Sequence, residues 1–132
     1  MPTDLSRPVL VIDDSTVTLH LIRRMLIRSG FSDVKTTEVA SKGLELLRTR
    51  PFGLVICDYY MSPVNGWDIY RTMQRDPALA RIPFVLTTAQ ETELAVTAKA
   101  RDMLRALAIK PFTESVLLER IARADALARA AA

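Results

Sequence analysis

The sequence predicts an α/β protein built on one open, five-stranded parallel sheet with helices on both faces. Five short apolar runs are spread along the 132 residues, and continuous runs of this length are typical of strands that are buried on both faces. They alternate with helical patterns about every 25 residues, which is the spacing of βαβ units. A closed barrel needs about eight such units, so an open, doubly wound sheet fits the chain better.

Composition and charge indicate one globular domain in a reducing compartment. Hydrophobic residues make up 49% of the chain, charged residues 25%, and the net charge is +3. The single Cys57 excludes an internal disulfide. No apolar run approaches the ~20 residues that span a bilayer, and the first residues lack a signal peptide's apolar region. We therefore expect a cytoplasmic protein without a membrane partner, and the scattered Lys and Arg residues predict no direct DNA binding.

Each strand is predicted from an apolar run that ends at a polar or turn-forming residue. The second run is less apolar than the others, so we expect it nearer the edge of the sheet. The predicted strands are 8–12, Val34–Thr37, Leu54–Asp58, Phe84–Thr88 and 106–109.

Helices are predicted between the strands from apolar residues at helical spacing and from capping residues. The first begins at the N-cap Ser15-Thr16 and stops at Ser29-Gly30; its apolar positions are Val17, Leu21, Ile22, Met25 and Leu26. The later helices are expected at 40–50 (with Leu44 and Leu47 inward), at 67–75, at 90–101, and after the N-cap Thr113.

These elements form one predicted domain at 8–125. A disordered lead is expected at 1–7, and an Ala-rich tail at 126–132 is expected to continue the last helix. Five units suit the flavodoxin-like strand order 2-1-3-4-5. That order places the first and third strands at the switch point, beyond which such sheets bind ligands.

Chemically active side chains stand where the predicted strands end. The first strand delivers Asp13 and Asp14, the third Asp58, the fourth Thr88, and the fifth Lys110. Three carboxylates at one crevice repel one another, and a hard cation such as Mg²⁺ relieves this repulsion. Asp14 alone could instead cap the first helix. Taken together, the five residues predict a metal-assisted phosphoryl site with a carboxylate as the nucleophile.

The same residues carry a resemblance to a known family. The motifs are Val11-Ile12-Asp13-Asp14-Ser15, Asp58-Tyr59-Tyr60-Met61, Gly66, Thr88-Ala89 and Lys110-Pro111-Phe112. In this order they resemble the receiver domain of bacterial response regulators, and most closely the single-domain, chemotaxis-like type. The resemblance covers roughly residues 8–125.

The resemblance implies a role for each residue of the site. Asp58 would accept a phosphoryl group from a sensor histidine kinase or a phosphotransfer protein. Asp13, Asp14, Asp58 and the backbone carbonyl of Tyr60 would hold Mg²⁺, and Thr88 and Lys110 would contact the phosphoryl oxygens. The Lys110-Pro111 bond would be cis. A signalling receiver of this kind is not an enzyme beyond its own phosphorylation and dephosphorylation.

The chain also departs from the family's pattern. Leu107 stands where the family has a switch aromatic, and Ser62-Pro63 replaces a proline that comes one residue earlier. The resemblance implies a protein target on the face formed by helix 90–101, strand 106–109 and the last helix. A homodimer is another contact that the resemblance leaves open.

Two other functions remain open at this stage. One is a receiver that acts without phosphate, as a scaffold or dimerisation module, which Leu107 favours and the complete acidic site disfavours. The other is an aspartyl-phosphate phosphatase, which is disfavoured because Tyr60, and not a second acid, stands two residues after Asp58. Nucleotide binding is disfavoured because no Gly-rich loop follows any strand.

Overall fold

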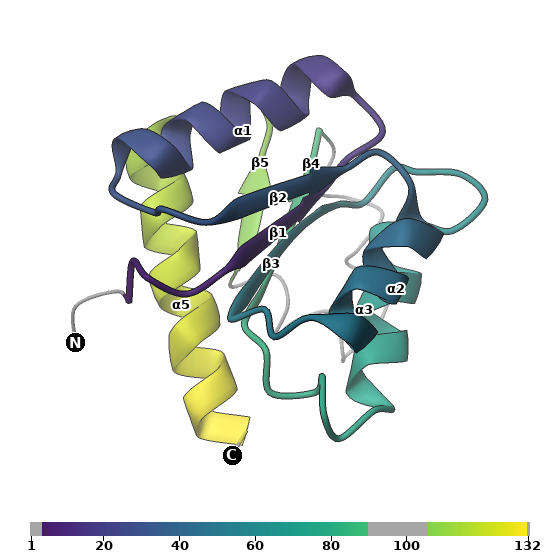
Figure 1. The fold of residues 1–132 in the computed structure, drawn as a ribbon. Helices are drawn as coiled ribbons and strands as arrows, with labels where there is room; N and C mark the ends of the chain where they lie inside the picture. The colour runs from purple at the N-terminus through teal and green to yellow at the C-terminus, as the bar shows by residue number, and fades with distance from the viewer. Residues whose placement is uncertain (1–3, 90–105, 132) are drawn as a thin grey trace.

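The computed structural model describes residues 4–89 and 106–131 and contains one parallel sheet, whose strand order β2-β1-β3-β4-β5 confirms the predicted topology. Figure 1 shows the α1 and α5 helices on one face of this sheet and α2 and α3 on the other. The predicted helix at 90–101 lies outside the described residues. The strands are β1 (Val9–Ile12), β2 (Val34–Thr37), β3 (Leu54–Asp58), β4 (Phe84–Thr88) and β5 (Leu107–Ile109). The helices are α1 (Thr16–Arg28), α2 (Ala40–Thr49), α3 (Gly66–Gln74) and α5 (Glu114–Ala131).

Burial along the strands explains why the apolar runs predicted them. The β1, β3 and β4 strands are buried at every residue, whereas β2, the least apolar, is only partly buried at the sheet edge. The register aligns the strand ends, because Ile12 pairs with Cys57 and Asp58 pairs with Thr87. The residues that follow β1 and end β3 and β4 therefore meet at one edge of the sheet.

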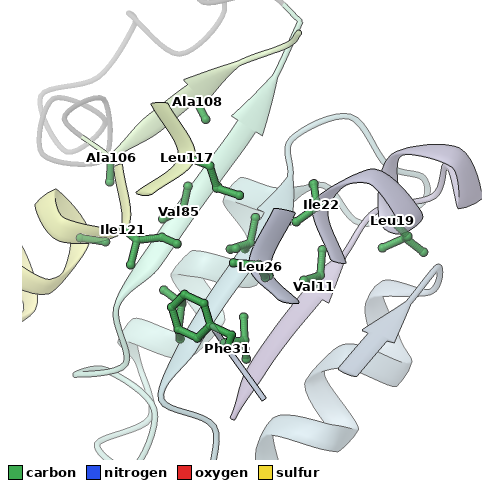
Figure 2. Packing of buried hydrophobic residues seen from close by; sticks show 14 residues of the cluster. Val11, Leu19, Ile22, Leu26, Phe31, Val85, Ala106, Ala108, Leu117 and Ile121 are labelled. Carbon is green, nitrogen blue, oxygen red and sulfur yellow. The ribbon is translucent and has the colours of Figure 1, made fainter. Parts of the chain in front are cut away.

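The core lies in two layers, one on each face of the sheet, and Figure 2 shows the layer beneath α1 and α5. In α1 the buried residues are Leu19, Ile22 and Leu26. Val17 and Leu21, which also sit at helical spacing, are not part of this buried set, since their side chains are 67% and 50% exposed. The buried stripe of α1 does not include Val17 and Leu21, and these two residues therefore form an apolar patch on the outer face of the helix.

Residues 4–7 of the N-terminal lead make defined contacts with the rest of the domain, so the expected disorder is wrong for these residues. Arg7 donates to both carboxylate oxygens of Asp125 on α5, at 2.7 and 2.9 Å, and to the Gly53 carbonyl at 3.2 Å. The Leu5 side chain lies against Gly30. A bidentate, largely buried ion pair of this geometry holds its segment in place, and composition alone does not reveal it. The predicted tail continues α5 as far as Ala131.

The path of the loop after β3 is determined by the close packing of the first residues of α3 against the end of that strand. Asn65 caps α3 by accepting from the Asp68 N–H, and the Asp68 carboxylate accepts from the Asn65 N–H, which forms a capping box. Gly66 follows, and a Cβ at this position would collide with the Asp58 carbonyl oxygen and with the Leu86 side chain. Glycine therefore lets the start of α3 approach the carboxyl end of β3. In the part of the chain that the structure describes, no helix is long and apolar enough to cross a membrane.

We expect Gly66→Ala to destabilise the fold by about 1–3 kcal/mol, the usual cost of forcing a methyl group into a filled site. The collision partner at Asp58 is backbone, which cannot rotate away. Urea denaturation measures the change, with Lys42→Ala at an exposed position of α2 as the control. An unchanged midpoint for Gly66→Ala would contradict this account of the loop.

Candidate functional site

Three carboxylates converge at the carboxyl edge of the sheet, as predicted. Oxygen atoms of Asp13, Asp14 and Asp58 all lie within 4.8 Å of one another. Asp58 ends β3 and Asp13 directly follows β1, and both are buried, with 5% and 1% of their surface exposed. Asp14 is exposed at the rim. Adjacent parallel strands bring these residues together because their carboxyl ends share an edge.

The start of α1 determines the hydrogen bonds of the two adjacent acids, Asp13 and Asp14. Ser15 is the N-cap, since its hydroxyl accepts from the Thr18 N–H at 3.2 Å. Asp13 accepts from the Ser15 N–H at 2.9 Å, which holds its carboxylate beneath the helix start. The alternative that Asp14 caps this helix is therefore wrong. The Asp14 carboxylate lies with those of Asp13 and Asp58 in the acidic group.

Lys110 joins two of the acids directly. Its Nζ lies 2.9 Å from Asp13 Oδ2 and 3.0 Å from Asp58 Oδ1. The side chain comes from the residue after β5, and its backbone N–H donates to the Thr88 carbonyl, which fixes it beside β4. The Lys110-Pro111 bond is cis, as the resemblance implied, and Ser62-Pro63 is cis as well.

Burial and charge both act on these groups. Burial is the largest influence on Asp58 and raises its pKa above the ordinary 3.8; the hydrogen bond from Lys110 opposes this, while the charge of Asp13 adds to it. Burial alone would lower the pKa of Lys110, but its hydrogen bonds to Asp13 and Asp58 outweigh burial and raise it. One ammonium shared by two buried carboxylates is held firmly charged, yet it compensates Asp58 only in part.

The acidic group fits a hard divalent cation. All three donors are carboxylate oxygens, the ligand type that Mg²⁺ prefers, and the exposed Asp14 leaves the rim open to water and to phosphate oxygens. Lys110 balances only part of the negative charge of the three carboxylates, and the charge that remains also favours a cation here. The Tyr60 carbonyl as a fourth ligand stays a prediction.

A second threonine stands beside the acid, and sequence reasoning missed it. The Thr87 hydroxyl lies 3.5 Å from Asp58 Oδ1, whereas the residue chosen from the sequence was Thr88, which is also fully buried. The signal that could have found Thr87 is strand pairing, because a residue aligned with Asp58 on the next strand presents its side chain to the same face. The contact of Thr88 with a phosphoryl oxygen stays a prediction.

We expect Asp58→Asn to stabilise the metal-free protein at neutral pH. A raised folded-state pKa means that the contribution of Asp58 to stability is full below its ordinary 3.8 and is lost as pH rises through the folded-state value. The neutral amide removes this loss, so the Tm should rise, and a domain of this size gains roughly 3–5 °C for each 1 kcal/mol of added stability. Thermal unfolding measured from about pH 3.5 to about pH 7 covers the range in which the linkage between protonation and folding changes the Tm of the parent.

Glu45→Gln, at an exposed position of α2, is the matched control, because it also neutralises one acid. A lower Tm for Asp58→Asn than for the parent at neutral pH would show that the Lys110 pairing outweighs the cost of burial.

Comparison with known proteins agrees with this fold. The sequence model of the response regulator receiver domain matches residues 9–122. The chemotaxis protein CheY of Pseudomonas aeruginosa is 26% identical over 113 residues, which cover 86% of this chain and 91% of the relative. The chemotaxis protein CheY-3 of Vibrio cholerae is 23% identical over the same share of this chain and 87% of its own length.

Solved structures share the architecture. Vibrio cholerae CheY4 is similar with a TM-score of 0.75 at 19% identity, covering 90% of this chain and 98% of that one. The N-terminal domain of a response regulator receiver protein from Methanoculleus marisnigri has a TM-score of 0.67 at 29% identity, covering 87% and 93%. Because the family match extends over most of the residues, including every strand, the chain belongs to the response regulator receiver domain family of two-component signalling, with chemotaxis receivers among its relatives.

Proposed function

We propose that this receiver accepts a phosphoryl group on Asp58 from a sensor histidine kinase or a phosphotransfer protein, with Mg²⁺ bound at the acidic group. The observation that carries the proposal is the position of Asp58. Asp58 ends a buried strand, and one of its carboxylate oxygens lies within 4.8 Å of oxygens of two further carboxylates. Its Oδ1 also lies 3.0 Å from Lys110 Nζ. Phosphoryl transfer to a carboxylate requires a nucleophilic acid, acids that hold a metal cation, and a positive charge such as the lysine ammonium.

In the proposed reaction, an Asp58 oxygen bonds to phosphorus as the bond from phosphorus to the donor nitrogen breaks. The nitrogen keeps the electron pair. Mg²⁺, held by Asp13, Asp14 and Asp58, supplies charge neutralisation for the phosphoryl oxygens when it is bound. Lys110 contributes a fixed positive charge from the other side, already close to the nucleophile.

The protein would act as a switch and would turn over no other substrate. The chemistry fits a cytoplasmic setting, where donor proteins phosphorylated on histidine are made. The scaffold and phosphatase alternatives have no observation in their favour as specific as the contact between Lys110, Asp13 and Asp58. A target on the face that includes β5 and α5, or a homodimer there, remains part of the proposal.

Leu107 bears on how such a switch is read. Its side chain is 4% exposed and belongs to the core on the α2 and α3 face of the sheet. Its carbonyl accepts from Arg120 of α5 at 2.8 Å. A buried aliphatic side chain offers no hydroxyl, so we expect the readout to work without an aromatic rotamer change at this position.

Incubation with a small acyl phosphate and Mg²⁺ tests the acceptor role directly. We expect a mass increase of one phosphoryl group in the parent and none in Asp58→Asn, and chelation of the metal should abolish the gain. Peptide mapping after trapping of the acyl phosphate checks the site. A parent that gains no mass, or an undiminished gain in Asp58→Asn, would overturn the proposed function.

We also propose where the donor protein docks. A groove of about 420 Å³ runs between α1 and the segment after β5. Leu21 and Met25 line it on one side, and Lys110 and Phe112 on the other. Lys110 belongs to both the groove and the acidic site, so an apolar surface on the donor that lies here would bring its phosphohistidine next to Asp58.

We expect Leu21→Asp to slow transfer from the donor protein about tenfold or more, because it places a charge in an apolar contact. Phosphorylation by the small acyl phosphate should be unchanged. The probe is the kinase that phosphorylates the parent fastest among those of the same organism. Val39→Asp, at an equally exposed apolar residue on the other face of the sheet, is the control. Equal transfer rates for Leu21→Asp and the parent would exclude this docking site.

A further inference from the structure

Thr87 is a buried hydroxyl at the carboxyl end of β4, directly beside the acid that ends β3. It pairs in register with Asp58 on one side and with Ala108 on the other. Its side chain is fully buried. The backbone of Thr87 is already used, since its carbonyl accepts from the Tyr59 N–H at 2.8 Å.

Two neighbours of Thr87 on the same face of the sheet, Val85 and Ala108, are apolar and buried. Figure 2 shows Val85 and Ala108 in the layer between the sheet and the α1 and α5 helices. Val85 precedes Thr87 by two residues and so shares its face of the strand. A valine would fill the same volume in such a place without a polar atom, and a buried hydroxyl needs a partner. The partner that the structure records for Thr87 is Asp58 Oδ1.

The hydroxyl and the ammonium reach the same atom. Lys110 Nζ lies 3.0 Å from Asp58 Oδ1, and Thr87 Oγ1 lies 3.5 Å from it. Two donors on one oxygen orient the carboxylate and leave Oδ2 as the atom that can attack phosphorus. A contact of 3.5 Å is long for a hydrogen bond between oxygens, but contacts of this kind in a resting site tighten in the reacting complex.

We propose that Thr87 is a positioning residue that acts through Asp58 and sets the lifetime of its phosphorylated form; this inference rests on the proposed function. In hydrolysis, the water oxygen bonds to phosphorus, and the protons of the water stay on the released inorganic phosphate or pass to the solvent. The bond from phosphorus to Oδ2 breaks, and its electron pair returns to the carboxylate. The returning charge is shared with Oδ1. A hydroxyl that donates to Oδ1 stabilises this leaving group more than it stabilises the uncharged carbonyl of the acyl phosphate.

The experiment compares the half-life of the phosphorylated form among variants, after removal of the acyl phosphate and with Mg²⁺ held constant. We expect Thr87→Val, which keeps the shape and loses the hydroxyl, to lengthen the half-life about fivefold, the effect of one hydrogen bond. Thr87→Ser should stay within about twofold of the parent because it keeps the donor. Thr36→Val, the same change on β2, is the matched control and should match the parent.

The far-UV circular dichroism spectrum of Thr87→Val should match that of the parent, which separates positioning from loss of the fold, and the half-life of Thr87→Ser reports on the hydroxyl itself. If Thr87→Val does not fold, Thr87→Ala removes the same hydroxyl without added bulk. Equal half-lives for the parent and the variants that lack the hydroxyl would overturn the inference, as would a Thr87→Ser protein that behaves like Thr87→Val. A parent that accepts no phosphoryl group would overturn the proposed function itself, and so the two failures are distinguishable.

Discussion

The contact of Lys110 with Asp13 and Asp58 is the interaction on which the site depends. Two carboxylates buried side by side would repel strongly in a medium of low dielectric constant, and both here are almost fully removed from water. The ammonium lies within 3.0 Å of each, which allows them to stay close while the site waits for a cation. Because one positive charge is shared by two negative ones, with the exposed Asp14 nearby, the site keeps a net attraction for a divalent ion.

The fold positions these charges through short local devices at the sheet edge. The N-cap Ser15 holds Asp13 by a backbone hydrogen bond at the start of α1, and the capping box at Asn65 with Gly66 lets α3 begin close to the Asp58 carbonyl. On the far side, the Lys110 N–H donates to the Thr88 carbonyl. Ser15 and Lys110 lie within a few residues of a strand end, and Gly66, although later in the chain, lies against the Asp58 carbonyl. The geometry of the site is therefore inherited from strand register and not from long loops.

This origin explains what the sequence could and could not predict. Strands such as Leu54–Asp58 were predictable because burial on both faces requires a continuous apolar run. The acids and Lys110 were predictable because strand ends meet at one edge. The exposure of Val17 and Leu21 was not predictable because helical periodicity does not say which of two overlapping stripes faces the sheet. Order at Arg7 depends on a partner 118 residues away, and Thr87 depends on the pairing of two strands, so neither is visible locally.

The last two residues of β4 are both threonines, and they act on the site in different ways. Thr87 and Thr88 are adjacent, both buried, and on a strand whose residues alternate between faces. Thr87 aligns with Asp58 and contacts its Oδ1, while the backbone carbonyl of Thr88 anchors Lys110. Both residues thus bear on the same carboxylate, one through its side chain and one through the lysine that its backbone holds. Leu107 on the neighbouring strand is packed into the core on the other face of the sheet, so the side-chain donors recorded at Asp58 Oδ1 are Thr87 of β4 and Lys110 after β5.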